Sequence, residues 1–354
     1  MEIGYELSWY LRLAWLLPLA GFAVEVFAGY WSNRHSKTAA YLATGCIAAG
    51  FVLSTTAFMR WGSHTDWDVF AASDSAGHHF VADDVEAGQS DHTTHDHAAG
   101  DHGETTQAVF SGTIYTLGAF GDLEITVDYY IDSLTLLMFM MVTLIATSIH
   151  VFAIGYMSDE LTDEYVDHSA HTSDGHHVHR LGRFHRFFSF MSLFCFSMLG
   201  LVLAGNIFQV FVFWELVGIC SYLLIGFYTE RDSANVAANK AFIVNRVGDF
   251  GFIIGLMILW TYCGTFRFAD SELDGHTQPG LFSMVRGSHG HIETHGDNVI
   301  LNTELQDGHW TAPHDPERTI PYTLLVVAGL GVFAGCIGKS AQFPLQTWLQ
   351  IGRA

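Results

Sequence analysis

Residues 211–228 read FVFWELVGICSYLLIGFY, an apolar run with one carboxylate, Glu215, near its middle and no Lys or Arg within four positions of it. About 20 apolar residues suffice for a helix to cross the roughly 30 Å of hydrocarbon in a bilayer. Comparable runs lie at about 9–29, 38–59, 130–156, 186–204, 207–228, 234–262 and 320–349. The sequence therefore predicts an all-α polytopic membrane protein with about seven transmembrane helices.

The loops between these runs are rich in His and Asp and are expected outside the membrane. The predicted order is two N-terminal helices in 1–60, an outward loop with a candidate hairpin in 61–128, the third helix in 129–156, a cytoplasmic loop in 157–184, helices four to six in 185–262, a second outward loop in 263–319, and a broken seventh helix in 320–354. The hairpin is expected because Gly121 and Asp122 separate two β-prone runs.

The net charge of −21 belongs to the loops, because 28 of the 36 acids lie in residues 60–128, 157–184 and 263–319. The five cysteines occur singly, with no Cys-x-x-Cys pair that would indicate an iron–sulfur or zinc framework. No glycine-rich nucleotide fingerprint follows a strand. The expected partner is a lipid bilayer, and no nucleic acid.

Basic residues predict the orientation. Arg34 and Lys37 lie between the first two runs, Arg183 precedes the fourth, and Arg231 lies between the fifth and sixth. The positive-inside rule assigns these connections to the cytoplasm. The N-terminus and the loops at 61–128 and 263–319 are then expected outside.

Of the 21 histidines, 18 lie in the same three acidic loops. Imidazole and carboxylate ligands suit zinc, nickel or copper, but these runs lack fixed ligand spacing. The favoured interpretation is a solvated low-complexity insert, so no metal site is predicted. The weak metal candidates are His92, His95, His97, His176, His177 and His179.

Glu215 is a candidate functional residue because a charge at the bilayer centre costs about 2.5–3.5 kcal/mol on insertion scales. It shares a helix face with Gly218, Tyr222 and Gly226, so a neighbouring helix can approach closely. The favoured interpretation is proton handling, and the alternative is a structural ion pair that locks two helices together.

The sixth run carries a polar stripe in SANVAANKAFIVNRVGDFGF (233–252), which includes Arg246 and Asp249. At a spacing of three these two residues can pair with each other, which would make them structural. Lys240 points away from the stripe and either snorkels to the headgroups or lines a channel entrance.

The seventh run, GLGVFAGCIGKSAQFPLQTWL (329–349), carries Lys339 and then Pro344. Proline lacks an amide proton and clashes with the preceding turn, so the helix should break just after Lys339. Broken helices at membrane depth line cavities and mark ion sites in transporters. The chain thus supplies an acid and a base, Glu215 and Lys339, near mid-membrane.

Three segments, WELVGICSYLLIGFY (214–228), KAFIVNRVGDFGF (240–252) and GKSAQFPLQTWL (338–349), resemble the antiporter-like subunits of respiratory complex I, the NADH:quinone oxidoreductase. The resemblance covers about 128–157 and 185–349 and is closest to the subunit L branch. It implies that Glu215 and Lys339 are the proton-handling pair of the first half-channel. It makes Asp249, Arg246 and Lys240 candidate modulators.

The resemblance also implies that the chain is a proton-translocating membrane-arm subunit in the bacterial inner membrane, with other membrane-arm subunits as partners. NADH, FMN, iron–sulfur clusters and quinone are then expected in other subunits, with no redox cofactor or redox site in this chain. The family continues beyond the segment that matches residues 338–349 with further helices, so a truncated copy of a longer subunit is expected.

Three alternatives remain open at this point. The chain resembles, more distantly, antiporter-like subunits of multisubunit sodium/proton antiporters or membrane-bound hydrogenases. It could instead be a structural membrane scaffold in which Glu215 and Arg246 tie helices together without flux. The least favoured alternative is a metal-buffering protein built on the histidine-rich loops.

Overall fold

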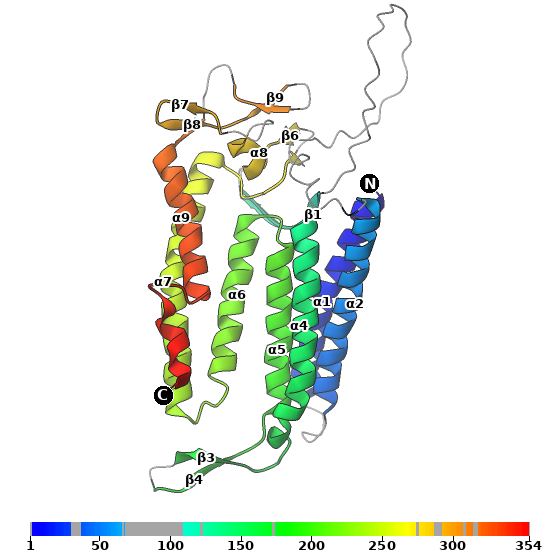
Figure 1. The fold of residues 1–354 in the computed structure, drawn as a ribbon, viewed down its shortest axis with the longest axis vertical. Helices are drawn as coiled ribbons and strands as arrows, with labels where there is room; N and C mark the ends of the chain where they lie inside the picture. The colour runs from blue at the N-terminus through cyan, green and yellow to red at the C-terminus, as the bar shows by residue number, and fades with distance from the viewer. Residues whose placement is uncertain are drawn as a thin grey trace, which may run out of the picture.

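The structure, a computed structural model, describes residues 2–29, 37–65, 67, 109–120, 123–171, 174–273, 276–286, 292–306, 309–313 and 318–353. Within these residues seven long helices run along one another (Figure 1). They are α1 Glu2–Gly29, α2 Thr38–His64, α4 Ser133–Tyr156, α5 Phe184–Leu203, α6 Ile207–Ile225, α7 Asp232–Cys263 and α9 Tyr322–Lys339. Each is long and apolar enough to cross a membrane. The chain is therefore an integral multi-pass membrane protein, which confirms the predicted fold class.

Short antiparallel strands occupy the connections between the long helices, so the loops are not purely irregular. They are β1 Phe110–Phe120, β2 Leu123–Ile131, β3 Tyr165–His171, β4 His177–Arg180, β5 Ser271–Leu273, β6 His276–Gln278, β7 Thr294–His295, β8 Asn298–Ile300, β9 Glu304–Gln306, β10 His309–Thr311 and β11 Thr319–Pro321. The pairs are β1 with β2, β3 with β4, β5 with β6 and β9 with β10, while β7, β8 and β11 form one three-stranded sheet. Two short helices, α8 Leu281–Val285 and the 3-10 helix η2 Gln346–Arg353, complete the described elements outside the seven spans and the turn at 158–160.

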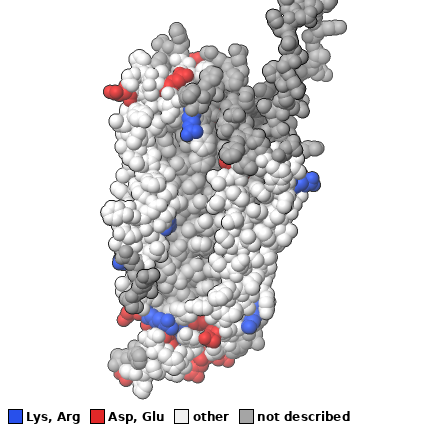
Figure 2. Space-filling view, in the orientation of Figure 1, with Lys and Arg blue, Asp and Glu red and all other residues white. Residues whose placement is uncertain are grey.

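The elements divide between the two ends of the helices. The N-terminus, β1, α8 and the strands β6 to β9 lie at one end, and β3 and β4 lie at the other (Figure 1). We name these the β1–β2 end and the β3–β4 end. On the face drawn in Figure 2 the charged side chains gather mostly at these two ends and leave a largely uncharged belt between them.

The third span begins later than the sequence predicts. Residues 129–131 belong to β2 and pair with β1, so the helix starts at Ser133 rather than at residue 129. Asp132 is its N-cap, and its carboxylate accepts a hydrogen bond of 2.7 Å from the backbone N–H of Thr135. This cap satisfies an otherwise unpaired N–H in the first turn.

The helices α1, α2, α4 and α5 form a four-helix bundle with a shared apolar core. Leu7, Leu11, Ile47, Phe139 and Leu199 are almost completely buried in it. Helix α6 packs against α5 on one side and α7 on the other. The bundle thereby connects to the pair α7–α9, which carries the remaining candidate residues.

Glycines allow α7 and α9 to pack with their backbones in contact. A Cβ atom added to Gly248 would lie 2.6 Å from the carbonyl oxygen of Ala334, and one added to Gly255 would lie 2.5 Å from that of Ala328. Small residues at a helix interface are the usual means of close approach in membranes. The pattern fixes α9, and therefore Lys339, against α7.

The connection 263–319 was expected to be a solvated insert, and the described part of it corrects that expectation. Val299, Leu301 and Ile320 are fully buried in a core with the β1–β2 ends of α7 and α9. The indole N–H of Trp310 donates a 2.7 Å hydrogen bond to Asp270. Aliphatic and aromatic residues between the histidines have enough apolar surface to form a packed cap.

The β3–β4 end is held by buried ion pairs. Arg180 contacts Glu160 at 2.7 Å and Glu230 at 2.5 Å, and Arg183 contacts Glu230 at 3.0 Å. Burial acts to raise the pKa of Glu230. The hydrogen bond and charge of Arg180 and the charge of Arg183 act to lower it and outweigh burial, so this pKa lies below its ordinary value. These pairs attach the connection 157–183 to the turn between α6 and α7.

A second ion pair at this end joins Arg231 to Asp167 of β3 at 2.8 Å, and the Asp167 side chain is completely buried. Burial again acts to raise the pKa of Asp167, and the hydrogen bonds from Arg231 and from the backbone N–H of Ser169 outweigh it, so the pKa is lowered. The strand β3 is thus a packed element and not a solvated repeat.

Candidate functional site

Glu215 lies in the middle of α6, as the ninth of its 19 residues. Its Oε2 atom forms an ion pair with the guanidinium of Arg246 on α7. The Arg246 guanidinium also lies 4.7 Å from the ring centroid of Phe242, one turn away on its own helix. The carboxylate therefore has a cation that comes from a neighbouring helix.

Asp249 is the second carboxylate of the site and is only 2% exposed. Its Oδ1 atom accepts a 2.8 Å hydrogen bond from the indole N–H of Trp214, the residue before Glu215 on α6. The carboxyl groups of Glu215 and Asp249 are close enough to interact with each other. The site therefore holds two neighbouring acids, of which Glu215 pairs with the guanidinium of Arg246 and Asp249 accepts from Trp214.

Lys339 is the last residue of α9, and its amine points back to α6. A Cβ atom added to Gly218 would collide with Nζ of Lys339, and Nζ lies 5.9 Å from the ring centroid of Trp214. The amine interacts electrostatically with both Glu215 and Asp249. Glycine at position 218 supplies the space that the amine occupies.

The helix break lies where the sequence predicts it. Helix α9 ends at Lys339, a turn containing Pro344 follows, and η2 begins at Gln346. The indole N–H of Trp348 donates a 2.9 Å hydrogen bond to the carbonyl oxygen of Gly338. Trp348 thereby satisfies one of the carbonyls that the end of the helix leaves without an intrahelical partner.

Several buried polar atoms of the site have no hydrogen-bond partner among the described residues. They are Oε1 of Glu215, Oδ1 of Asn245, Nζ of Lys339 and Oε1 of Gln346. Buried polar groups in proteins are nearly always paired, so unpaired ones need an explanation. An acid and a base with unused hydrogen-bonding capacity can each take up or release a proton.

The polar residues of α7 are distributed as follows. The structural interpretation, in which Arg246 pairs with Asp249 on its own helix, is not what the structure has, because Arg246 pairs with Glu215 and Asp249 accepts from Trp214. The reason is that α6 packs along the same face of α7 and presents competing partners. Lys240 lies on an exposed face of α7 and is not part of the cluster.

The histidine candidates separate into two groups. His92, His95 and His97 lie outside the described residues. His179 contacts the carboxylate of Glu164 at 2.7 Å, while the rings of His177 and His168 are 4.9 Å apart. In the part of the chain that the structure describes, no three His, Cys, Asp or Glu side chains are grouped to hold a metal ion.

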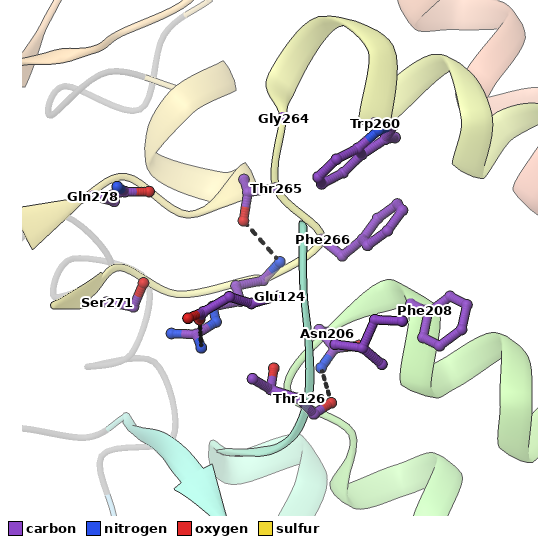
Figure 3. Close-up of a pocket in the computed structure, with 12 residues that line it drawn as sticks. Glu124, Thr126, Asn206, Phe208, Trp260, Gly264, Thr265, Phe266, Ser271 and Gln278 are labelled. Carbon is purple, nitrogen blue, oxygen red and sulfur yellow. Dashed lines mark hydrogen bonds and ion pairs between the residues drawn. The ribbon is translucent and has the colours of Figure 1, made fainter. Parts of the chain in front are cut away.

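A separate pocket lies at the β1–β2 end, between the start of α6 and the connection that follows α7 (Figure 3). Arg267 pairs there with Glu124 at 3.1 Å, and Asn206 donates a 3.0 Å hydrogen bond to the carbonyl oxygen of Thr126. The charged side chains of Arg267 and Glu124 in this lining are thus paired with each other. The pocket contains neither Glu215 nor Lys339 and therefore does not enter the candidate site.

Sequence reasoning missed the roles of Trp214 and Trp348. Trp214 joins the cluster by its N–H and its ring, and Trp348 binds the broken end of α9. The adjacency of Trp214 to Glu215 was a usable signal, because buried indole N–H groups usually find a partner. Nothing local to Trp348 indicates which carbonyl it reaches.

Comparison with known families gives two matches. Residues 204–288 match the family described as "NADH:quinone oxidoreductase/Mrp antiporter, TM", and residues 118–165 match "NADH-Ubiquinone oxidoreductase (complex I), chain 5 N-terminus". The first match contains Glu215, Arg246 and Asp249. Lys339 lies beyond both.

Individual relatives are similar over most of the chain. NADH-quinone oxidoreductase subunit L of Neisseria meningitidis serogroup B is 31% identical over 346 residues, which cover 97% of this chain and 37% of that protein. Chloroplastic NAD(P)H-quinone oxidoreductase subunit 5 of Anthoceros angustus is 35% identical over 229 residues, or 65% of this chain and 24% of that protein. The matched residues thus span between about a quarter and little more than a third of the length of these relatives.

Among solved structures, the Mrp complex from Dietzia sp. DQ12-45-1b aligns with a TM-score of 0.49 and 16% identity, over 99% of this chain and 25% of that chain.

Proposed function

This chain is a homologue of the antiporter-like subunits of NADH-quinone oxidoreductase, and from that relationship we propose that it is a proton-translocating membrane-arm subunit of such an enzyme. The observation that carries the proposal is the cluster of Glu215, Asp249, Arg246 and Lys339, which unites α6, α7 and the broken end of α9. Ionisable residues in a transmembrane segment mark ion pathways and proton relays.

In this proposal Glu215 and Lys339 form the first half-channel. Charge coupling links the two, because an ionised Glu215 favours a charged Lys339 and a protonated Glu215 weakens that attraction. Asp249 and Arg246 modulate the pair, since Arg246 competes with Lys339 for Glu215. A small displacement of α9 relative to α6 would then change which group holds the proton.

Electron transfer takes place elsewhere in the complex in this proposal. NADH, FMN, iron–sulfur clusters and quinone are bound by other subunits, and the chain responds to conformational or electrostatic change in its membrane-arm neighbours. The chain lies in the bacterial inner membrane with its N-terminus outside. The exit half of the relay lies in the part of the relatives that has no counterpart in these residues.

The test uses Glu215→Gln and Lys339→Ala in the full-length subunit within its complex. Each variant should lower proton translocation about tenfold or more, equivalent to at least about 1.4 kcal/mol on the transport barrier, while the complex still assembles. Translocation is measured by quenching of a pH-sensitive dye in vesicles, and assembly by native gel electrophoresis. Glu6→Gln is the control, because Glu6 forms a half-exposed pair with Arg60 at 3.3 Å.

The same variants separate transport from a purely structural role. A scaffold in which Glu215 and Arg246 only tie α6 to α7 predicts that the variants fail to assemble. Normal translocation by both assembled variants would remove the pair from the mechanism.

A second candidate is a subunit of a multisubunit sodium/proton antiporter, because the family matched by residues 204–288 includes Mrp antiporters. This alternative predicts sodium-dependent proton exchange without NADH oxidation. Copurification of NADH-oxidising partners with the chain would instead support the respiratory enzyme.

A further inference from the structure

Glu25 is a buried carboxyl that belongs neither to the Glu215 cluster nor to the ion pairs at the β3–β4 end. It lies on α1 in the apolar stretch LAGFAVEVFAG (19–29), and 3% of it is exposed. Helix α1 packs against α2 and α5 in the four-helix bundle, as Figure 1 also shows. The carboxyl therefore faces protein rather than lipid.

The described groups that act on Glu25 carry no formal positive charge. The hydroxyl of Ser192 on α5 donates a 3.4 Å hydrogen bond to Oε1, and Oε2 has no hydrogen-bond partner among the described residues. The thiols of Cys46 on α2 and Cys195 on α5 interact with the same carboxyl. Among the groups that the structure describes, no Lys or Arg acts on it.

The remaining helix of the bundle presents His150 to α5 near this level. The ring of His150 on α4 packs against Phe188, which precedes Ser192 by one helical turn, and its Nδ1 lies 2.7 Å from the carbonyl oxygen of Ala146. This ring contacts its own helix and α5, and it is not among the groups that act on Glu25.

An isolated carboxylate in such a site is strongly disfavoured. Burying an unpaired ion is costly even after relaxation, and one long hydroxyl hydrogen bond offsets only part of that cost. Binding a proton to the carboxyl removes its charge and converts one of its oxygens into an O–H donor. We propose that Glu25 is a second proton-binding carboxyl of this chain, in the interface of α1, α2 and α5.

The chemistry of the lining favours a proton over a hard metal cation. Hard cations require several oxygen ligands, and the described side chains around Glu25 offer one hydroxyl and two thiols. A protonated carboxyl needs only one acceptor for its O–H and one donor to its C=O. The site does not depend on the assignment of Glu215, which lies on α6.

The test is infrared absorption of the full-length chain in hydrated membranes at neutral pH. The spectrum of wild type minus Glu25→Gln should contain a carboxylic acid C=O band and lack the paired bands of a carboxylate. Ser192→Ala should shift that band to higher frequency, because a carbonyl that loses a hydrogen bond vibrates faster. Glu215→Gln should leave the band in place, which separates this proposal from the half-channel.

Carboxylate bands in place of the acid band would overturn the proposal. So would carboxylate bands that move when sodium replaces choline, since they would identify a cation site. If Glu25→Gln does not fold, the spectrum of wild type minus Ser192→Ala decides: a derivative feature in the acid region supports the proposal, and its absence there contradicts it.

Discussion

At the scale of single residues, Glu215 and Lys339 depend on neighbours from other helices. Arg246 pairs with Glu215 from α7, and Gly218 of α6 provides the space for the amine of Lys339. Both groups lie within segments that cross the membrane, where an unpaired charge is expensive. Their chemistry is therefore set by the packing of α6 against α7, and of α9 against α7.

Gly218→Ala tests whether the position of the Lys339 amine beside α6 matters, because it adds a single carbon atom there. The added Cβ would meet the flexible end of Lys339, so the lysine can yield and the fold should survive with a cost of about 1–3 kcal/mol. We expect a thermal unfolding midpoint within a few degrees of the parent and a clear loss of proton translocation in vesicles.

Gly329→Ala is the matched control on α9, since nothing lies within 4 Å of its added Cβ. It should change neither the unfolding midpoint nor translocation. Normal translocation by Gly218→Ala would show that the position of the amine beside α6 is not required.

The sequence predicted the candidate acid and base but not the geometry of their site. An acid inside an apolar run is visible by inspection, as is a lysine before a helix-breaking proline. The sequence left open whether Arg246 pairs with Asp249 or with Glu215, because the i, i+3 rule treats a helix in isolation. The hydrogen bond from Trp214 to Asp249 requires knowing how α6 is rotated.

At the scale of elements, the β3–β4 hairpin depends on ion pairs with the turn between α6 and α7. Arg180 is 8% exposed, and its partners Glu160 and Glu230 are 2% and 7% exposed. Breaking a buried pair by removing one partner typically costs about 3–5 kcal/mol. The hairpin is therefore expected to respond to the charge state of these carboxylates.

We expect the hairpin to loosen in acid. The pKa values of Glu230 and Asp167 are lowered in the fold, so their contribution is complete above the ordinary carboxyl pKa near about 4 and is lost as the pH falls through the lowered values. The hydrogen-exchange protection factors of the amides in β3 and β4, which correct for the intrinsic pH dependence of exchange, should fall over that acid range and stay constant between about pH 5 and 8.

Arg180→Ala should lower the hydrogen-exchange protection factors of the hairpin amides at neutral pH. It should also make those factors less dependent on pH in the acid range. Arg60→Ala is the control, because its pair with Glu6 is about half exposed and surface pairs contribute about 0–1 kcal/mol. Acid-independent exchange in the parent protein would contradict an ionic attachment of the hairpin.

At the scale of the whole molecule, the connections gather at two ends separated by a largely uncharged belt (Figure 2). The connections before α4 and before α9 lie with the N-terminus, and the β3–β4 hairpin lies opposite (Figure 1). Basic residues at the β3–β4 end include Arg180, Arg183 and Arg231. From the positive-inside rule we predict that the β3–β4 end faces the cytoplasm.

Cysteine labelling tests this orientation. Asp174→Cys in the hairpin and Thr294→Cys in β7 are both at exposed positions. A membrane-impermeant maleimide should label Thr294→Cys in intact spheroplasts and Asp174→Cys only in inverted vesicles. The unmodified chain, whose five cysteines are buried or half buried, measures background, and the reverse pattern would invert the orientation.

The sequence by itself determined the seven spans, because the length of an apolar run is a local property and a run of about 20 residues matches the thickness of the bilayer core. It also located the end of α9, since the steric effect of a proline acts within one turn. Only the tertiary structure decided that the connection 263–319 packs into a core, that Arg246 serves Glu215, and that Glu25 faces Ser192. These contacts depend on how helices rotate and pack against segments distant in the chain, and that is set by complementary surfaces rather than by local sequence.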